Sequence, residues 1–317
     1  MNPRIKSLLF LHTAVFLWGF TAILGKLVSY NSFNLVWHRM LITALVYLCL
    51  PAVWRGLRSI SWQSAGIFIG IGVIVCAHWV AFYGSIKLGN SASVTLACLG
   101  TTSFFSAILD PLINRKPFLI QELLLGLLVV AGILLIYFAL PQSGDSGVDY
   151  PAAISTGVLS AFLAALFTSL NKRHIQKTSA VTLSALEMVA GALLLSALLP
   201  FIPDIHMVWL PGFNPLVGDW DLLWVLLLAI VCTNFTFYLG AYALQELSAF
   251  TANLTVNLEP IYGIILGALI FGENNDLNLA FYLGACLILL AVFVQSVLEY
   301  RLRRKTKYEE HSPGFID

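Results

Sequence analysis

Two short stretches of similar sequence, VCAHWVAFYG at residues 75–84 and VCTNFTFYLG at residues 231–240, decide how this chain is organised. The similarity continues beyond them, because Ser91-Ala92 follows the first stretch much as Ser248-Ala249 follows the second. Both stretches lie within long apolar segments, and further apolar segments follow each of them. We therefore predict that the chain contains one structural unit twice.

Apolar segments fill most of the chain. Hydrophobic residues make up 59% of the sequence and charged residues 10%, whereas soluble domains carry about 25% charged residues. A helix that crosses a bilayer needs about 20 consecutive, mostly apolar residues. The segments of this kind are 8–28, 34–54, 63–86, 91–113, 119–140, 151–170, 180–200, 220–244, 248–271 and 278–299. They predict an all-α integral membrane protein with ten transmembrane helices.

The basic residues fall almost entirely on one side of these segments. Of the 17 lysines and arginines, only three depart from this pattern: Lys26 and Lys87 fall on the opposite side, and Arg39 falls inside a span. An excess of basic residues marks the cytoplasmic side of a membrane protein. Both termini are therefore predicted to be cytoplasmic, in a multi-pass protein of the bacterial inner membrane.

Each copy of the repeat contains an odd number of spans, five, so the second copy is predicted to be inverted relative to the first. The expected units are residues 1–144 with spans 1 to 5, an external linker at 145–150, residues 151–300 with spans 6 to 10, and a basic cytoplasmic tail at 301–317. Inverted repeats of this kind are common among secondary transporters.

Small residues recur at four-residue spacing in several spans. Helices approach one another closely in lipid where such residues line one face. These residues are Ala153, Gly157, Ala161 and Ala165 in span 6, Gly66 and Gly70 in span 3, and Gly263 and Gly267 in span 9. We expect them either to pack static helices or to form surfaces that slide during a conformational change.

Several stretches resemble a known family. They are FLWGF at residues 16–20, His38-Arg39, NLEPIYG at residues 257–263 and GALIFGE at residues 267–273. On these, the whole chain resembles the drug/metabolite transporter superfamily, in its ten-span EamA branch of bacterial metabolite and amino-acid exporters. The resemblance implies a central cavity formed mainly by spans 1 to 4 and 6 to 9, with spans 5 and 10 at the periphery. Residues 110–116, DPLINRK, lack the Gly-Glu pair of the pattern, so the two halves are expected to differ in function.

Three ionisable side chains are predicted to lie inside spans, where a charge is costly and therefore points to function. Arg39 and Glu187 occupy matching places in the two halves, and Glu259 lies mid-span with Thr102 as its counterpart. The Glu259-Pro260 pair is expected to break its helix near the membrane midplane. For an amino acid, Arg39 would bind the carboxylate by two parallel hydrogen bonds, and Glu259 or Glu187 would bind the ammonium group. Alternatively, Arg39 pairs with a glutamate inside the fold or reaches the outer interface.

Other polar and aromatic side chains are expected to line the same cavity or to pack between helices. They are Trp18 in span 1, His78 and Tyr83 in span 3, Asn234 and Tyr238 in span 8, and Asn253, Asn257 and Tyr262 in span 9. Aromatic walls with a few polar groups are typical of small-molecule sites. A buried Glu259 is also expected to carry a proton during the cycle, which would couple export to a proton gradient.

These features predict a secondary transporter that exports small metabolites, most of all amino acids, by alternating access. The expected partners are a small-molecule substrate, the lipid bilayer and protons, without nucleic acid, in a monomer or a loose dimer. The sequence has neither a phosphate-binding loop nor metal-ligand spacing, so we expect no enzyme activity, no cofactor and no metal site. The alternatives are a carrier of nucleotide-linked metabolites, organic anions or drugs, a ten-span channel, or a membrane enzyme.

Overall fold

The computed structural model of the chain describes residues 3–115, 117–140, 147–202, 208–214, 219–247, 255–256 and 258–311. Across these ranges the chain is almost entirely helical, and the pairing of Asn214 with Asp219 is an isolated β-bridge. The predicted all-α membrane architecture is confirmed.

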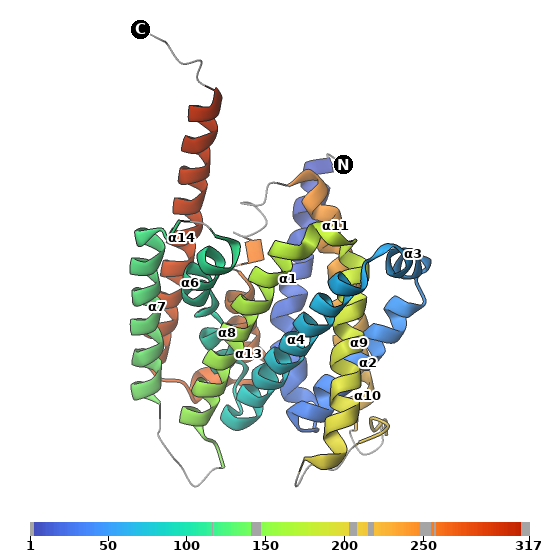
Figure 1. The fold of residues 1–317 in the computed structure, drawn as a ribbon. Helices are drawn as coiled ribbons and strands as arrows, with labels where there is room; N and C mark the ends of the chain where they lie inside the picture. The colour runs from blue at the N-terminus through green and yellow to red at the C-terminus, as the bar shows by residue number, and fades with distance from the viewer. Residues whose placement is uncertain are drawn as a thin grey trace.

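The helices follow one another with short connections. In the first half they are α1 (Pro3–Leu27), α2 (Ser32–Leu48), α3 (Pro51–Ser59), α4 (Trp62–Gly89), α5 (Ala92–Leu99), α6 (Thr102–Asn114) and α7 (Ile120–Ala139). In the second half they are α8 (Tyr150–His174), η1 (Ile175–Lys177), α9 (Ala180–Leu198), η2 (Leu199–Phe201), α10 (Asp221–Leu226), the π-helix η4 (Leu227–Phe235), α11 (Thr236–Glu246), α13 (Glu259–Phe271), η5 (Glu273–Asn275) and α14 (Leu279–His311). Helix α1 begins and α14 ends at the same end of the bundle, the upper end in Figure 1. Following the predicted topology, we call this the inner end and the opposite one the outer end.

Seven helical segments of the described chain are long and apolar enough to cross a membrane, and the bent pair α2–α3 would make an eighth. One of the seven, Ala92–Asn114, consists of α5 and α6 together. Two shorter apolar helices, α13 and the Leu279–Val294 part of α14, lie where spans 9 and 10 are predicted. The chain is therefore a multi-pass membrane protein, and the count of ten spans stays a prediction.

The prediction that span 2 continues from 34 to 54 is wrong at its end. Helix α2 stops at Leu48, and α3 leaves it at an angle of 86°. The reason is Pro51, which occupies the first position of α3 and holds Leu50 in an extended conformation with ψ 121°. In α3, Val53 is fully buried and Trp54 is half-exposed. The indole of Trp54 donates a hydrogen bond of 2.7 Å to the carbonyl oxygen of Leu48, which fixes the bend.

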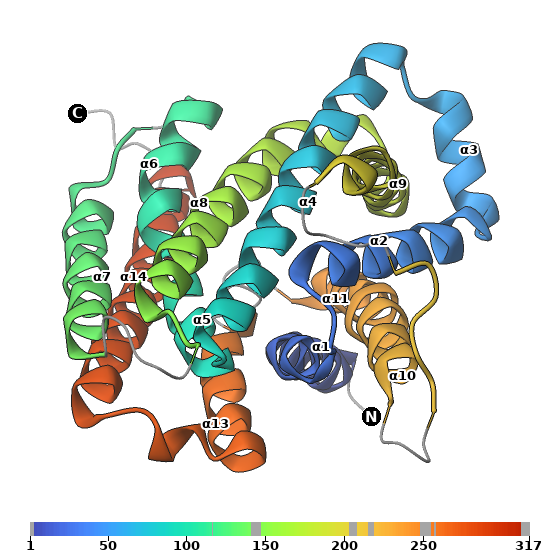
Figure 2. The ribbon, with the colours of Figure 1, turned by 90° about the horizontal axis from the view of Figure 1, so that it is seen from below.

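The two halves pack through matching pairs of helices. Helix α4 packs extensively along α8 and α9, α2 packs against α9, and α1 packs against α11 and α13. Helices α7 and α14 pack against each other at one edge of the bundle, opposite α3 (Figure 2). The expected peripheral place of spans 5 and 10 agrees with this arrangement.

Small residues make the closest of these contacts possible. A Cβ atom at Gly157 of α8 would lie 2.8 Å from Cβ of Cys98 in α5 and 2.9 Å from the hydroxyl of Ser85 in α4. In α4, the expected pair Gly66 and Gly70 has no neighbour within 4 Å, and another glycine makes the contact instead. A Cβ atom at Gly72 would lie 2.6 Å from the backbone of Glu187 in α9.

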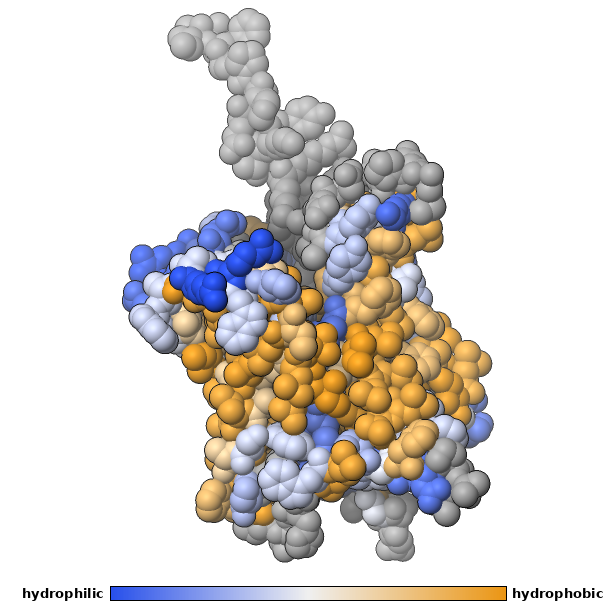
Figure 3. All heavy atoms as spheres, turned by 90° about the vertical axis from the view of Figure 1, so that its right-hand side faces the viewer, coloured by the Kyte–Doolittle hydropathy of each residue, from blue (hydrophilic) through white to orange (hydrophobic). Residues whose placement is uncertain are grey.

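The surface of the described chain carries an apolar band between two polar ends (Figure 3). Large apolar side chains such as Leu45, Leu193 and Leu269 are 55%, 65% and 78% exposed. So many exposed apolar side chains are unfavourable in water but favourable against lipid tails. The band therefore marks the surface that faces the bilayer.

Candidate functional site

Arg39 on α2 is buried and held by three side chains from two other helices. Its Nε and Nη2 atoms donate to the Thr233 hydroxyl on η4 at 3.1 and 2.9 Å. Its Nη1 atom donates to the Tyr83 hydroxyl on α4 at 2.5 Å. The guanidinium carbon lies 3.9 Å from the ring centroid of Trp79, in a cation–π contact. Arg39 therefore pairs with hydroxyl groups and an aromatic ring, and not with a glutamate among the described residues.

The π-helix η4 presents Thr233 to Arg39. In the π conformation, the Thr233 hydroxyl donates to the carbonyl of Leu228 at 2.8 Å, and the Asn234 amide donates to the carbonyl of Ala229 at 3.1 Å. Hydroxyl side chains that bond their own backbone in this way disturb a regular α-helix. Short π-helical turns are frequent at functional sites.

Trp18 on α1 joins this cluster from the other side of η4. Its indole nitrogen donates to the Thr236 hydroxyl at 2.9 Å, and Thr236 follows directly after η4. Thr236 itself is fully buried and bonds the carbonyl of Cys232 at 3.0 Å. Helices α1, α2, α4 and the η4–α11 junction thus converge on one polar region, which we call the Arg39 cluster.

Glu259 approaches the Arg39 cluster from α13. The helix begins at Glu259, and the adjacent Pro260 occupies its first turn. A Cβ atom at Gly19 of α1 would lie 3.1 Å from the backbone carbonyl of Glu259. Glu259 is half-buried, the charge of Arg39 acts on its carboxylate, and its side chain makes no hydrogen bond or ion pair with any described residue.

Thr102 holds the corresponding place in the first half. Helix α5 ends at Leu99, and α6 begins at Thr102. Thr102 and Glu259 are therefore each the first residue of a helix that follows a break, as the predicted correspondence requires. The Thr102 hydroxyl is buried and without a hydrogen-bond partner in the described chain. The N-terminal ends of such helices attract negative charge.

His78 on α4 is engaged elsewhere. Its Nδ1 atom lies 2.9 Å from both the carbonyl oxygen and the hydroxyl of Ser160 on α8, and its ring packs against Phe82 and Phe167. His78 thus ties α4 to α8, which is the packing role that we weighed against a ligand role.

The remaining predicted residues lie apart from the Arg39 cluster or outside the description. Tyr262 on α13 lies 3.4 Å from Nδ1 of His12, and its ring packs against Phe16. Tyr238 on α11 is 63% exposed. The Asn234 amide bonds its own helix, and its side-chain oxygen is buried without a partner among the described residues. Asn253 and Asn257 lie outside the described residues.

Glu187 on α9 lies in a separate buried region. The residue is 4% exposed, and the Asn171 side chain of α8 faces its carboxylate. The charge of Glu187 also reaches the hydroxyl of Tyr47 on α2, which faces Ser184. Arg39 and Glu187 are therefore not partners of each other, although both lie at matching depths in the two halves.

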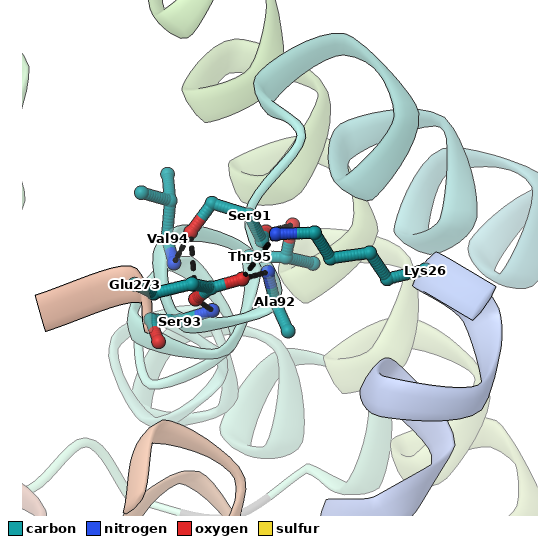
Figure 4. Close-up of polar contacts among 7 residues, drawn as sticks. All are labelled: Lys26, Ser91, Ala92, Ser93, Val94, Thr95 and Glu273. Carbon is teal, nitrogen blue, oxygen red and sulfur yellow. Dashed lines mark hydrogen bonds and ion pairs between the residues drawn. The ribbon is translucent and has the colours of Figure 1, made fainter. Parts of the chain in front are cut away.

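At the outer end, a further cluster joins three segments that the sequence did not connect (Figure 4). The ammonium of Lys26 on α1 lies 2.8 Å from Oε1 of Glu273. The Glu273 carboxylate also accepts hydrogen bonds from the backbone nitrogens of Ala92 and Ser93, both at 2.9 Å, and from the Ser91 hydroxyl at 3.1 Å. Glu273 thereby caps the N-terminal end of α5, where a carboxylate is favourable. We call these residues the outer latch.

The surroundings of Glu273 also fix its charge. Burial alone would raise the pKa of Glu273, but the hydrogen bonds from Lys26, Ser93 and Ala92 outweigh burial and hold the pKa below its ordinary value. Glu273 is therefore ionised at neutral pH.

Sequence reasoning missed Trp79, Thr233 and Thr236 in the Arg39 cluster, and Lys26 as part of the outer latch. Thr233 and Thr236 were visible as hydroxyl groups within an otherwise apolar span. Lys26 was visible as one of the few basic residues on the outer side, as was Lys87, whose ammonium bonds the carbonyl of Val28. Within the described residues, no group of three or more His, Cys, Asp or Glu could hold a metal ion.

Comparisons with known proteins agree on one family. The model of the EamA-like transporter family matches residues 5–138 and again residues 151–297. An uncharacterised transporter of Archaeoglobus fulgidus is 22% identical over 238 residues, which cover 75% of this chain and 79% of that protein. A solved crystal structure aligns with a TM-score of 0.60 and 16% identity, over 93% of this chain and 98% of that one, and so shares the fold. Because the family model matches most of the chain, the protein belongs to the EamA-like transporter family and is a secondary transporter of small solutes.

Proposed function

We propose that this protein exports small zwitterionic metabolites, most of all amino acids, across the bacterial inner membrane by alternating access. The observation that carries the proposal is the approach of Arg39 and Glu259 to one region from α2 and α13, without a direct bond between them. A cation and an anion held near each other but unpaired match the two charges of a zwitterion.

Arg39 retains donors for a substrate carboxylate. A guanidinium group has five N–H donors, and the described contacts occupy one on each nitrogen. The two that remain belong to the terminal nitrogens Nη1 and Nη2. Two donors on neighbouring nitrogens are what a carboxylate needs for two parallel hydrogen bonds. Thr233, Tyr83 and Trp79 would then hold the guanidinium in place before the substrate arrives.

Glu259 would bind the ammonium group of the substrate. It is the first residue of α13 and has no bond of its own in the described chain, so binding a cation there breaks no existing contact. When no substrate is bound, a proton on Glu259 would neutralise the charge, which would couple export to a proton gradient.

Alternating access requires that the outer end opens and closes. In the present conformation the outer latch joins α1, α5 and η5. We propose that this latch closes the outer gate and separates when the site faces outward. The predicted inverted repeat is supported by the way α2 pairs with α9, and α7 with α14, across the two halves.

Counterflow in proteoliposomes tests the substrate class. Vesicles preloaded with one amino acid at a time should take up the same labelled amino acid in a saturable manner. Glu259→Gln should lower the exchange rate at least about tenfold, the size of one lost charge-assisted hydrogen bond. Glu122→Gln, the same change near the start of α7, should leave the rate unchanged. Absence of exchange for every amino acid, with folded protein, would remove the zwitterion proposal and favour nucleotide-linked metabolites, organic anions or drugs.

The gate is tested by cysteine labelling. Single cysteines at positions 26 and 273 should become more reactive from outside, and cysteines near Glu187 less reactive from inside, when a substrate shifts the conformation. A change in the same direction at both ends would contradict alternating access.

A further inference from the structure

The region around Glu187 contains more hydrogen-bond acceptors than the fold satisfies. Four side-chain oxygens there are buried and have no hydrogen-bond partner within the described residues. They are Oε1 of Glu187, Oδ1 of Asn171, Oγ of Ser184 and the hydroxyl oxygen of Tyr47. They come from three helices, α2, α8 and α9. Buried polar atoms are almost always satisfied in folded proteins, so four unsatisfied oxygens in one place require an explanation.

These oxygens lie near one another. Asn171 faces the Glu187 carboxylate, Ser184 faces the Tyr47 hydroxyl, and the charge of Glu187 acts on Tyr47. Ser184 and Glu187 are three residues apart on α9 and therefore lie on the same face of the helix. Glu187, Ser184 and Tyr47 are 4%, 1% and 5% exposed. The four oxygens thus converge on one buried place.

No described cation neutralises Glu187. The neighbouring cations of α8 point to α6 instead: Lys172 pairs with Asp110 at 3.1 Å, and Arg173 donates to the carbonyl of Ile113 at 2.7 Å. The charges that act on His174 come from Lys177 and Arg173, and no charged group of the described chain acts on Glu187. An isolated carboxylate buried in a membrane protein is costly, so a mobile positive charge is needed here.

We propose that Glu187, Asn171, Ser184 and Tyr47 form a binding site for a sodium ion. One carboxylate and three neutral oxygens match the charge of a monovalent cation, and hard cations prefer such oxygen ligands. A proton on Glu187 would satisfy one acceptor and leave the Asn171 oxygen without a donor. A metal cation accepts lone pairs from all four oxygens at once.

The packing around the site keeps Glu187 in position. Gly72 of α4 lies directly against the backbone of Glu187, where a Cβ atom would come within 2.6 Å. Helix α4 therefore fixes the part of α9 from which Glu187 and Ser184 project. The site lies apart from the Arg39 cluster, and its role, driving export by sodium entry, rests on the proposed transport function. Sodium binding itself does not depend on that function.

Thermal unfolding of the purified protein in detergent tests the site. Raising NaCl at constant ionic strength, with choline chloride as the replacement, should raise the apparent Tm by about 2–4 °C as the site fills. KCl should have a smaller effect. Binding of ²²Na⁺ should be saturable, with a Kd at least about tenfold weaker in Glu187→Gln, which removes the charge.

Two further variants protect the test from folding failure. Ser184→Ala removes one ligand with a small change in volume and should reduce the sodium-dependent shift in Tm. Glu122→Gln should retain the full shift. The proposal is overturned if NaCl and choline chloride give the same Tm, or if both site variants keep the wild-type shift. It is also overturned if lowering the pH in choline chloride stabilises the protein and sodium adds nothing, because the carboxyl group then takes a proton. Sodium binding without amino-acid exchange would support this site and count against the substrate proposal alone.

Discussion

Arg39 and Glu187 make an instructive pair, because the predicted repeat gives them matching places and the fold treats them differently. Arg39 has a hydroxyl partner for each of its three nitrogens and an aromatic ring against its face. Glu187 is as deeply buried but has a carboxylate oxygen without any partner in the described chain. Depth in the membrane therefore does not tell what a charge is for. The state of its hydrogen bonds does: Arg39 is positioned by the fold, and Glu187 awaits a ligand.

The largest effect is expected from Arg39. Arg39→Met should lower the free energy of unfolding by about 3–5 kcal/mol, because it removes several hydrogen bonds to a charged group and leaves the buried hydroxyls of Tyr83 and Thr233 unpaired. Denaturant unfolding in mixed micelles measures this loss. Arg39→Lys keeps the charge but not the fork of donors, and should fall between the two. Wild-type stability in Arg39→Met would show that the Arg39 cluster does not hold the helices together.

A carboxylate with all its partners extends the comparison. Glu273→Gln should lower the free energy of unfolding by about 2–3 kcal/mol at pH 7, because the ion pair with Lys26 is lost and the cap of α5 is weakened. The folded-state pKa of Glu273 lies below its ordinary value of 4.5. Its contribution to stability is therefore complete above that pH and is lost as the pH falls through the folded-state pKa.

Acid titration of unfolding measures this dependence. The wild-type protein should lose stability below about pH 4.5 more steeply than Glu273→Gln. Parallel curves for the two proteins would show that the outer latch does not depend on the ionised carboxylate.

The contact that positions Glu187 has a matched pair of glycines. Gly72→Ala should lower the free energy of unfolding by about 1–3 kcal/mol, the usual cost of overpacking, because the new Cβ meets the Glu187 backbone. Gly70→Ala, on the same helix with no neighbour within 4 Å, should be neutral or slightly stabilising. Thermal unfolding of the two variants side by side measures the difference. Equal values would place α4 farther from α9 than described here.

The smallest effect has the opposite sign. In sodium-free buffer, Glu187→Gln should raise the free energy of unfolding by about 1 kcal/mol, because it removes a buried charge that lacks a partner. Denaturant unfolding in choline chloride is the suitable measurement. A loss of stability as large as that of Arg39→Met would mean that Glu187 is as fully paired as Arg39, and the comparison would fail.

The sequence predicted which buried side chains deserve an account but not which partners they have. Arg39, Glu187 and Glu259 stand out because their neighbours in the chain are apolar. The hydroxyl of Thr233 reaches Arg39 through a π-helix, and nothing in the periodicity of span 8 predicts that conformation. The membrane fold followed from hydrophobic segments alone, because a bilayer leaves few alternatives to helices.

The errors have specific causes. The bend after α2 was visible in the Leu50-Pro51 pair, but the hydrophobic run continued past it. The four-residue spacing of Gly66 and Gly70 marked a face of α4 that meets no neighbour, while Gly72 meets α9. Spacing defines a helical face, but the neighbouring helices decide which face is covered.

Helix α13 has one consequence that concerns mechanics. Glu259 is its first residue, and Glu273 of the outer latch follows two residues after its last, so a single rod of about 20 Å joins the two. At the far end of this rod, a Cβ atom at Gly267 would lie 2.9 Å from the Glu273 carboxylate. A rigid helix transmits tilt along its whole length, so α13 can act as a lever. Under the proposed function, a solute drawing on Glu259 would strain the latch directly, without any relay of side chains between them.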